Sequence, residues 1–234
     1  MRLTLRQRAS WLAHAFKAAT QQHHLELSPV FARHIPADGV IVDVGAHAGQ
    51  FSKLFAGMAP GGHVYAFEPS AYARSVMGPA LRFNAITNIT IIPMGLARAP
   101  GELALHTPIK RQGSLGFGTA HLGPGVGRVH DQIVTLTTLD AFVAERGLAR
   151  VDFIKADIEG WELQALLGAE RTLRRDRPAL YLEVDEALLA RAGDSPAALF
   201  DWLGDLGYGA FATPGLTPAK AYGGAGDYLF IARE

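Results

Sequence analysis

The chain has 234 residues, 49% of them hydrophobic, which fits one α/β domain of enzyme size better than two small ones. Its 22 acidic and 22 basic residues give zero net charge, so the composition gives no indication of nucleic acid as the main partner. Cysteine is absent, which excludes disulfides and cysteine-ligated zinc but does not by itself give the compartment. No apolar run approaches the ~20 residues of a transmembrane helix, so we expect no transmembrane segment. We expect a cytoplasmic protein.

Residues 1–25 predict an amphipathic helix. They contain basic residues and no acid, as a transit peptide does: Arg2, Arg6, Arg8 and Lys17. Apolar residues at helical spacing favour instead a helix that packs on the domain or on a second subunit: Leu5, Trp11, Leu12, Ala15 and Phe16. We therefore expect a helical cap over residues 1–35, through which two copies of the chain could associate, and one domain over residues 36–234.

The first strand–turn–helix unit is the most informative part of the chain. Residues 40–44 are near-continuously apolar, as in a strand buried on both faces, and residues 48–58 have the spacing of a helix. In a parallel α/β sheet, the turn between such elements lies under a bound cofactor. A dinucleotide fingerprint needs Gly-x-Gly-x-x-Gly, but from Gly45 onward His47 and Gln50 stand where the second and third glycines belong.

The turn has instead the pattern Asp43-x-Gly45-x-His47-x-Gly49, with an acid inside the strand end, as in sites for S-adenosylmethionine (SAM). SAM carries no phosphate, so the loop needs only to let backbone pass close to a methionine tail and a ribose. Gly45 and Gly49 permit this approach because they lack Cβ. Asp43 can order the loop or accept a hydrogen bond from the cofactor's ammonium. A glycine turn of any doubly wound domain remains the alternative interpretation.

A second acid follows at the end of the next strand. Residues 62–68 predict a strand that ends at Glu68 and is stopped by Pro69. The Glu68 carboxylate would lie at the carboxyl end of the neighbouring strand, where it can accept hydrogen bonds from both ribose hydroxyls. This position supports an adenosine ligand without choosing between SAM and a nicotinamide cofactor.

The chain then leaves the alternation of strands and helices. After a third predicted strand over residues 89–94, residues 102–107 and 132–137 predict an extra antiparallel pair. The glycine-rich residues 108–131 connect these two strands. A loop this long inside a compact domain is uncommon and tends to be functional, so we expect a lid over the site.

The strongest chemical cluster is the segment Phe153-Ile-Lys-Ala-Asp-Ile-Glu-Gly-Trp-Glu162. Its first residues predict a buried strand, and Asp157 falls where that strand ends, beyond which ligands bind in such sheets. Glu159 and Glu162 can instead be acids in the first turn of the following helix, where the helix dipole favours them. Lys155 can simply pair with a carboxylate.

The remaining elements complete one doubly wound α/β fold. The predicted strands are 40–44, 63–68, 89–94, 151–156 and 179–184. The predicted helices are 48–58, 70–85, 138–146, 160–174 and 196–206. Residues 207–212 and 226–233 predict a closing hairpin. We therefore expect a mostly parallel, seven-stranded, Rossmann-like sheet with an antiparallel C-terminal hairpin, the arrangement of class I methyltransferases.

Several of these motifs together resemble the FkbM family of SAM-dependent methyltransferases. They are Asp43-Val-Gly-Ala-His-Ala-Gly49, Phe67-Glu68-Pro69, the Asn84…Asn88 stretch, Thr138-Leu-Asp140, Asp152-Phe-Ile-Lys-Ala-Asp-Ile-Glu-Gly-Trp-Glu162 and Leu182-Glu183-Val184. The likeness runs from about residue 39 to residue 185, and Lys-x-Asp-x-Glu-Gly is its most specific part. The family often carries Asn at the position of His47, and both side chains can form hydrogen bonds.

The resemblance and the strand-end positions together indicate two sets of site residues. The expected cofactor-binding residues are Asp43, Gly45, Ala46, His47, Gly49, Gln50, Phe51, Glu68, Pro69, Met94, Gly95 and Asp157. The expected catalytic residues are Asp157, Glu159, Glu183, Lys155 and His106, with His130 next in line. A hydroxyl is a poor acid, so a general base is expected among them, or a divalent metal held by acid and histidine ligands.

Three functions remain open from the sequence. The resemblance implies a SAM-dependent O-methyltransferase, with S-adenosylhomocysteine (SAH) as product, that acts on a hydroxyl of a sugar, glycolipid, polysaccharide or secondary metabolite. An oxidoreductase with an NAD-type cofactor is the second, and the failed glycine spacing weakens it. The third is a non-catalytic SAM-binding partner subunit.

Overall fold

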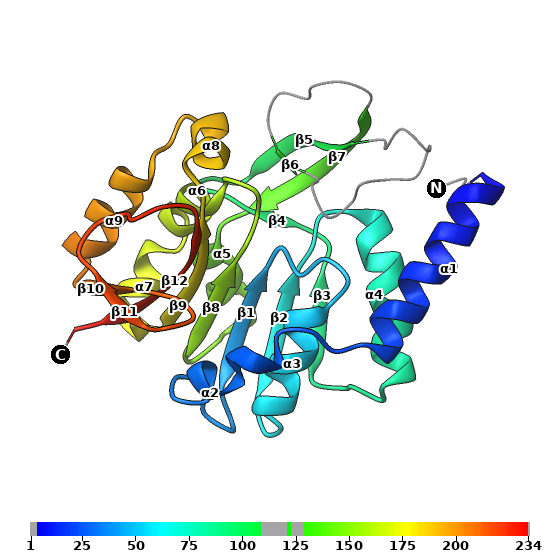
Figure 1. Cartoon of the computed structure of the whole chain (residues 1–234), viewed down its shortest axis with the longest axis horizontal. Coiled ribbons are helices and arrows are strands. Elements are labelled where there is room, and N and C mark those ends of the chain that lie inside the picture. Colours follow the sequence, from blue (N-terminus) through cyan, green and yellow to red (C-terminus); the bar gives the residue numbers. More distant parts are fainter. Residues whose placement is uncertain (1–3, 109–120, 123–128, 234) are drawn as a thin grey trace.

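The computed structural model describes residues 4–108, 121–122 and 129–233. Its centre is an eight-stranded sheet in the order β11-β10-β12-β9-β8-β1-β2-β3 (Figure 1). The strands are β1 Val40–Val44, β2 His63–Phe67, β3 Ile89–Ile92, β8 Phe153–Ala156, β9 Ala179–Val184, β10 Tyr208–Ala212, β11 Thr217–Ala219 and β12 Gly226–Ala232. β3, β2, β1, β8 and β9 are parallel, whereas β12, β10 and β11 pair antiparallel.

The predicted doubly wound fold with an antiparallel C-terminal hairpin is therefore confirmed, with one strand more than the seven expected. The additional strand, β11, has only three residues, Thr-Pro-Ala, and pairs with β10 at the sheet edge. A proline lowers the strand signal of a sequence, but it is tolerated at an edge because its missing N–H removes no ladder bond there.

Helices cover both faces of this sheet. They are α3 Gln50–Met58, α4 Ala71–Phe83, α5 Leu139–Arg146, α6 Glu162–Leu167, α7 Glu170–Asp176, α8 Glu186–Leu189, η3 Ala190–Ala192 and α9 Pro196–Asp205. Alternate strand residues point to opposite faces, so Ile41 packs towards α3 while Val42 packs towards α5 and α6. The parallel strands are buried on both faces, which explains their near-continuous apolar sequences.

The helix predicted over residues 160–174 is wrong as one element, because the structure divides it into α6 and α7. Gly168 follows α6, and a Cβ on it would lie 2.1 Å from the backbone oxygen of Ala97. The helix therefore ends where the chain passes close to a loop 71 residues earlier (168 − 97). The helical spacing of the segment does not reveal it.

A second, smaller sheet extends from the carboxyl edge of the first one. Its order is β4-β7-β5-β6, with β4 Gly95–Leu96, β5 Gly101–Pro108, β6 His121–Leu122 and β7 Val129–Thr137. The predicted antiparallel pairing of residues 102–107 with 132–137 is confirmed. Most of the insert 108–131, which the sequence predicts to be a lid, lies outside the described residues, so the lid stays a prediction.

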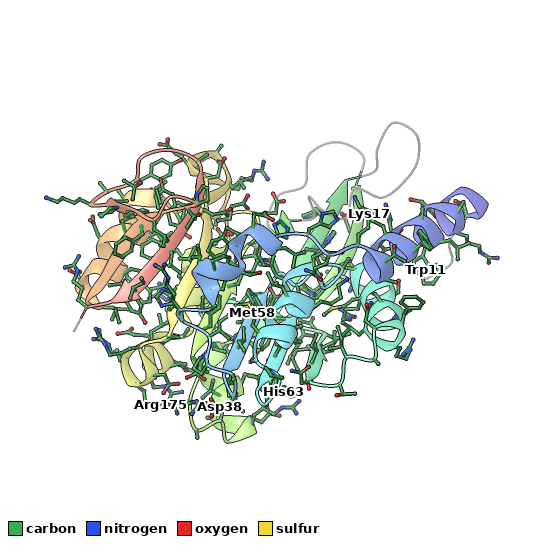
Figure 2. The ribbon with its side chains drawn as sticks, turned by 60° about the horizontal axis from the view of Figure 1, so that its bottom comes forward. Trp11, Lys17, Asp38, Met58, His63 and Arg175 are labelled. Carbon is green, nitrogen blue, oxygen red and sulfur yellow. The ribbon has the colours of Figure 1, made fainter. Side chains whose placement is uncertain are left out.

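The N-terminal segment forms α1 Leu5–Thr20, η1 Leu25–Leu27 and α2 Ser28–Phe31. Figure 1 shows α1 at one end of the molecule, beside α4. Trp11, which Figure 2 labels on this helix, donates its ring N–H to the Ser75 hydroxyl of α4 at 2.9 Å. The division into a cap and a domain at residue 35 stays a prediction. None of the helices in the described ranges is long and apolar enough to cross a membrane.

Candidate active site

A cleft opens at the carboxyl edge of β1, β2 and β8, and the smaller sheet forms part of its wall. It contains about 1050 Å³ of empty space, which includes its open mouth. Its lining residues are His24, Val44, Gly45, Ala46, His47, Gln50, Phe51, Phe67, Glu68, Pro69, Gly95, Leu96, Leu105, Lys155, Asp157, Ile158 and Glu159. Ligands of open α/β sheets bind at this edge.

The turn after β1 is held close to the loop after β8. The backbone N–H groups of Gly45 and Ala46 both donate to Phe67 O at 3.0 Å, which fixes the turn against β2. Gly45 has a φ of 73°, and a Cβ on it would lie 2.1 Å from Asp157 O. His47 has a φ of 51°, in a region that His and Asn tolerate better than most residues. The Asn that the resemblance predicts at this position would suit the same backbone.

Lys155 is a buried cation between two carboxylates. Its Nζ lies 3.6 Å from Asp43 Oδ1 and 3.4 Å from Asp157 Oδ2, and it donates to Gly45 O at 3.2 Å. The Phe51 ring centroid lies 5.2 Å from the same nitrogen. Burial lowers the pKa of Lys155, but the charges of Asp157 and Asp43 outweigh it, so the net shift of the pKa is upward. The lysine therefore stays charged and holds the ends of β1 and β8 together.

Asp43 lies behind the cleft rather than in it. The residue is fully buried, and its Oδ2 accepts a hydrogen bond from the Ser52 hydroxyl of α3 at 2.5 Å. Burial raises the pKa of Asp43, while Lys155 and Ser52 act in the opposite direction. Of its two expected roles, the ordering of the loop is the one that these contacts support.

Asp157 and Glu183 form a coupled carboxyl pair at the ends of β8 and β9. Burial raises the pKa of Asp157, but Lys155 and a hydrogen bond with Glu183 outweigh it, so the net shift of the pKa is downward. Burial and the neighbouring Asp157 raise the pKa of Glu183 to about 8. Asp157 is therefore the more acidic member of the pair, and Glu183 is the member that holds a proton more readily. The Asp157 side chain is 45% exposed and lines the cleft.

Glu68 closes the cleft beside β2 and is almost fully buried. Its Oε2 accepts from His47 N and its Oε1 from Ser70 N, each at 2.7 Å. Burial raises the pKa of Glu68, while these two N–H donors and Arg74 act against the shift. Glu68 thus joins the turn after β1 to the start of α4, and each oxygen retains a lone pair for a ligand.

The loop from Ile158 to Gly160 is held by Glu162, the first residue of α6. The Oε1 atom of Glu162 accepts from Ile158 N at 2.9 Å and from Gly160 N at 3.3 Å. Burial raises the pKa of Glu162 to about 7, against these two donors. Glu159 has a φ of 58° and lines the cleft, so the two acids have different places: Glu162 supports the loop and Glu159 lies on its ligand side.

A family model described as the methyltransferase FkbM domain matches residues 43–209. The chain belongs to this family. It is 24% identical over 215 residues to the 2-O-methyltransferase NoeI of Sinorhizobium fredii, with 86% of the chain and 85% of NoeI covered. It is 27% identical over 201 residues to the AMB antimetabolite synthetase AmbE of Pseudomonas aeruginosa, with 72% of the chain but 9% of AmbE covered. It also spans 62% of the methyltransferase sdnD of Sordaria araneosa, at 26% identity.

Solved structures show the same fold. A methyltransferase FkbM from Methylobacillus flagellatus KT matches 94% of the chain and 58% of its own length, with a TM-score of 0.54 and 16% identity. A putative methyltransferase from Streptococcus mutans in complex with SAH matches 90% of the chain and 97% of its own length, with a TM-score of 0.51 and 11% identity. At these identities the likeness concerns the fold alone.

The cleft of this FkbM protein brings together most of the residues that the sequence predicts for its site. Those lining it are Gly45, Ala46, His47, Gln50, Phe51, Glu68, Pro69, Gly95, Lys155, Asp157 and Glu159. Those outside the lining are Asp43, Gly49, Met94, Glu183 and His106. Gly49 packs against Met77, and Met94 packs against the core. His106 Nδ1 lies 2.7 Å from Asp131 Oδ1. The side chain of His130 lies outside the described part of the chain.

The sequence interpretation missed two kinds of lining residue. Apolar residues beside the predicted acids, such as Phe67 and Leu96, could have been inferred from their strand-end positions. His24 could not, because it precedes the first strand and reaches the cleft only through long-range contacts. Its ring stacks on Phe51 at a centroid distance of 4.2 Å. Gln22 Nε2 donates to Gln50 O at 2.9 Å, which attaches this segment to the start of α3.

The cleft fits the chemistry of SAM. The apolar residues Phe67, Pro69, Leu96 and Leu105 offer a surface for an adenine, and Glu68 at one side and Asp157 at the other offer acceptors for hydroxyl and ammonium groups. The described residues support a metal ion less well than they support SAM. Among them, no group of three or more His, Asp or Glu side chains is arranged to hold an ion.

Proposed function

We propose that this FkbM protein is a SAM-dependent O-methyltransferase that acts on a hydroxyl of a sugar, glycolipid, polysaccharide or secondary metabolite. The observation that carries the proposal is the position of Asp157, whose carboxylate lies 3.4 Å from Lys155 Nζ and shares one cleft with Glu68 and the turn after β1. A carboxylate at this place can accept the proton of a hydroxyl beside a bound cofactor.

The residues that would hold SAM come from three neighbouring strand ends. Glu68 would accept from the ribose hydroxyls with its remaining lone pairs, while the turn from Gly45 to His47 would pass beside the methionine portion. Bound SAM supplies an electrophilic methyl group on a sulfonium. Gly95 and Leu96 of β4 would flank the adenine.

Asp157 is a weak base, because Lys155 lowers its proton affinity. It would therefore first orient the hydroxyl by accepting its hydrogen bond, and take the proton only as the oxygen becomes positively charged during methyl transfer. Glu183 would keep the Asp157 carboxylate in place through their shared hydrogen bond. Glu159 lies near enough on the same loop to contact the acceptor.

Two further observations support a hydroxyl acceptor. NoeI, which matches 86% of the chain, is a 2-O-methyltransferase. The cleft also has an edge that lies outside residues 43–209, formed by His24 of the N-terminal segment. Burial lowers the pKa of His24, so its imidazole is neutral at pH 7 and can donate to and accept from an uncharged polyol.

The proposal is tested with the full chain, labelled SAM and a cell-envelope extract as the source of acceptors. We expect label to enter a product whose new methyl is stable to base, as an ether is and an ester is not. At saturating SAM, Asp157→Asn should reduce this transfer by ~10²-fold or more. Asp205→Asn, a change of an exposed acid on α9, is the matched control.

Three results would contradict parts of the proposal. If the protein binds SAM but transfers no methyl group to any fraction of the extract, a non-catalytic SAM-binding partner subunit is favoured. Full transfer by Asp157→Asn would move the chemistry to another residue. Loss of transfer on addition of a chelator, restored by a divalent ion, would assign the activation of the hydroxyl to a metal.

A further inference from the structure

The outward side of α1 is an apolar stripe with a basic residue at each edge. At 3.6 residues per turn, the exposed residues between positions 8 and 17 follow one another around the helix in the order Arg8, Leu12, Phe16, Ala9, Ala13 and Lys17. We call these six residues the outer face of α1. The opposite side of the helix, which includes Trp11 and Ala18, packs on α4. The outer face therefore has no partner within the described chain.

This end of the molecule also carries three of the five exposed large apolar side chains of the described residues, including the two most exposed, Phe83 and Phe16. Phe16 is 71% exposed, Leu12 is 61% exposed and Phe83 at the end of α4 is 72% exposed. Phe83 lies near the last turn of α1, because the neighbouring Asn84 donates from Nδ2 to Ala19 O at 2.9 Å. Figure 1 shows α1 as the outermost element on this side, so no other labelled element covers its outward side.

The charged side chains of α1 and α4 are of one sign. Residues 1–25 and 69–101 contain no Asp or Glu, although the whole chain has 22 acids and 22 bases. The exposed charges of α1 and α4 are therefore basic, and include Arg8, Lys17 and Arg82. The 22 acids that balance the bases all lie in other parts of the chain. This separation of charge makes the end with α1 attractive to an anionic surface.

We propose that the outer face of α1, together with Phe83, docks the protein on an anionic membrane surface. Phenylalanine and leucine side chains enter the boundary between headgroups and acyl chains, while arginine and lysine at the edges of the stripe pair with lipid phosphates. A second copy of the chain fits less well. A twofold dimer would place the same patch against itself, and Arg8, Lys17 and Arg82 would face like charges without an acid on either helix to pair with them.

The test uses the full chain and vesicles of phosphatidylcholine, with and without phosphatidylglycerol. We expect the protein to co-sediment with the phosphatidylglycerol vesicles, to bind the neutral ones weakly, and to be released by salt because the attraction is screened. The double change Leu12→Gln and Phe16→Gln should weaken binding ~10-fold or more, as should Arg8→Glu with Lys17→Glu. All these side chains are exposed, so the thermal melt should stay unchanged.

The matched controls are Ile133→Gln, an exposed apolar residue on β7, and Arg191→Glu, an exposed basic residue on η3. They should bind the vesicles as the native chain does. Absence of binding to either kind of vesicle, or binding that the two double variants leave unchanged, overturns the proposal. The proposal is also overturned if light scattering shows a dimer that the double change Leu12→Gln and Phe16→Gln dissociates. Binding to duplex DNA that this double change leaves intact overturns it as well. None of these results depends on the methyl transfer.

Discussion

At the scale of single residues, there are two physical reasons why position 45 needs a glycine. The sequence interpretation assigns its lack of Cβ to access for the cofactor. The structure adds a constraint within the protein, since a Cβ would lie 2.1 Å from Asp157 O and 2.8 Å from the Ile158 side chain. The glycine therefore sets the distance between the turn after β1 and the loop that carries the proposed base.

We predict that Gly45→Ala lowers the free energy of unfolding by about 2 kcal/mol or more, because it combines a positive φ with a backbone clash. Gly57→Ala is the control. Gly57 lies in α3 with nothing within 4 Å of the Cβ position, so this change should stabilise the protein by ~0.5–1 kcal/mol. Urea denaturation measures both values. Equal effects of the two changes would contradict the proposed contact.

Glu183 makes a prediction about pH. Its pKa of about 8 in the folded protein lies far above the ~4.3 of an unfolded chain, so between these values the folded state binds the extra proton. The stability of the native protein should therefore fall as pH rises from about 5 through 8. Glu183→Gln removes this loss. The melting temperature of the variant minus that of the native protein should therefore increase as pH rises over this range, by ~2–4 °C for each kcal/mol of stability that the native protein loses.

The control for this change is Glu186→Gln, which alters an exposed acid at the start of α8. Its difference in melting temperature from the native protein should be the same at pH 5 and pH 9. If Glu183→Gln behaves like this control, the proton shared with Asp157 is not part of the folded state.

At the scale of elements, the sequence predicts what local patterns encode. The parallel strands are found because burial on both faces leaves near-continuous apolar runs such as Val40–Val44. The acids of the cleft are found because they stand at the ends of these runs. The division of the helix at Gly168 and the edge strand β11 are missed, because they depend on contacts with distant parts of the chain.

The attachment of the N-terminal segment depends on another contact of this kind. Lys53 of α3 is buried, and its Nζ donates to Ala18 O at 2.5 Å and to Gln21 O at 3.0 Å. These carbonyls belong to the last turn and the end of α1, which lack helical partners. Lys53 thus joins the end of α1 to the helix that begins at the cleft.

We predict that Lys53→Met lowers stability by ~1–3 kcal/mol, since buried carbonyls lose their donor. Chymotrypsin should then cleave within residues 1–25 several-fold faster than in the native protein, as the segment detaches from α3. Limited proteolysis with identification of the cut site measures this effect. Lys220→Met, which changes an exposed lysine, should leave the cleavage unchanged. Equal cleavage of both variants would show that the segment is held by other contacts.

At the scale of the whole molecule, the centre of the cleft and its edges have different origins. The centre comes from residues 43–209, which match the family, and its acids could be predicted from motifs. One edge comes from His24 of the N-terminal segment. His24 lies outside the family match and reaches the site only when the chain folds, so no local pattern predicts it.

The cofactor can be tested on the whole molecule through its stability. A ligand present at ~100 times its dissociation constant stabilises the folded state by about 2.7 kcal/mol, which corresponds to ~5–10 °C for a chain of this size. We predict a shift of this order with SAH and none with NAD, because His47 and Gln50 occupy positions where a pyrophosphate needs glycines. Differential scanning calorimetry measures both. An equal shift of the melting temperature with NAD would favour an oxidoreductase with an NAD-type cofactor. No shift of the melting temperature with SAH at any concentration would contradict the site described for SAM.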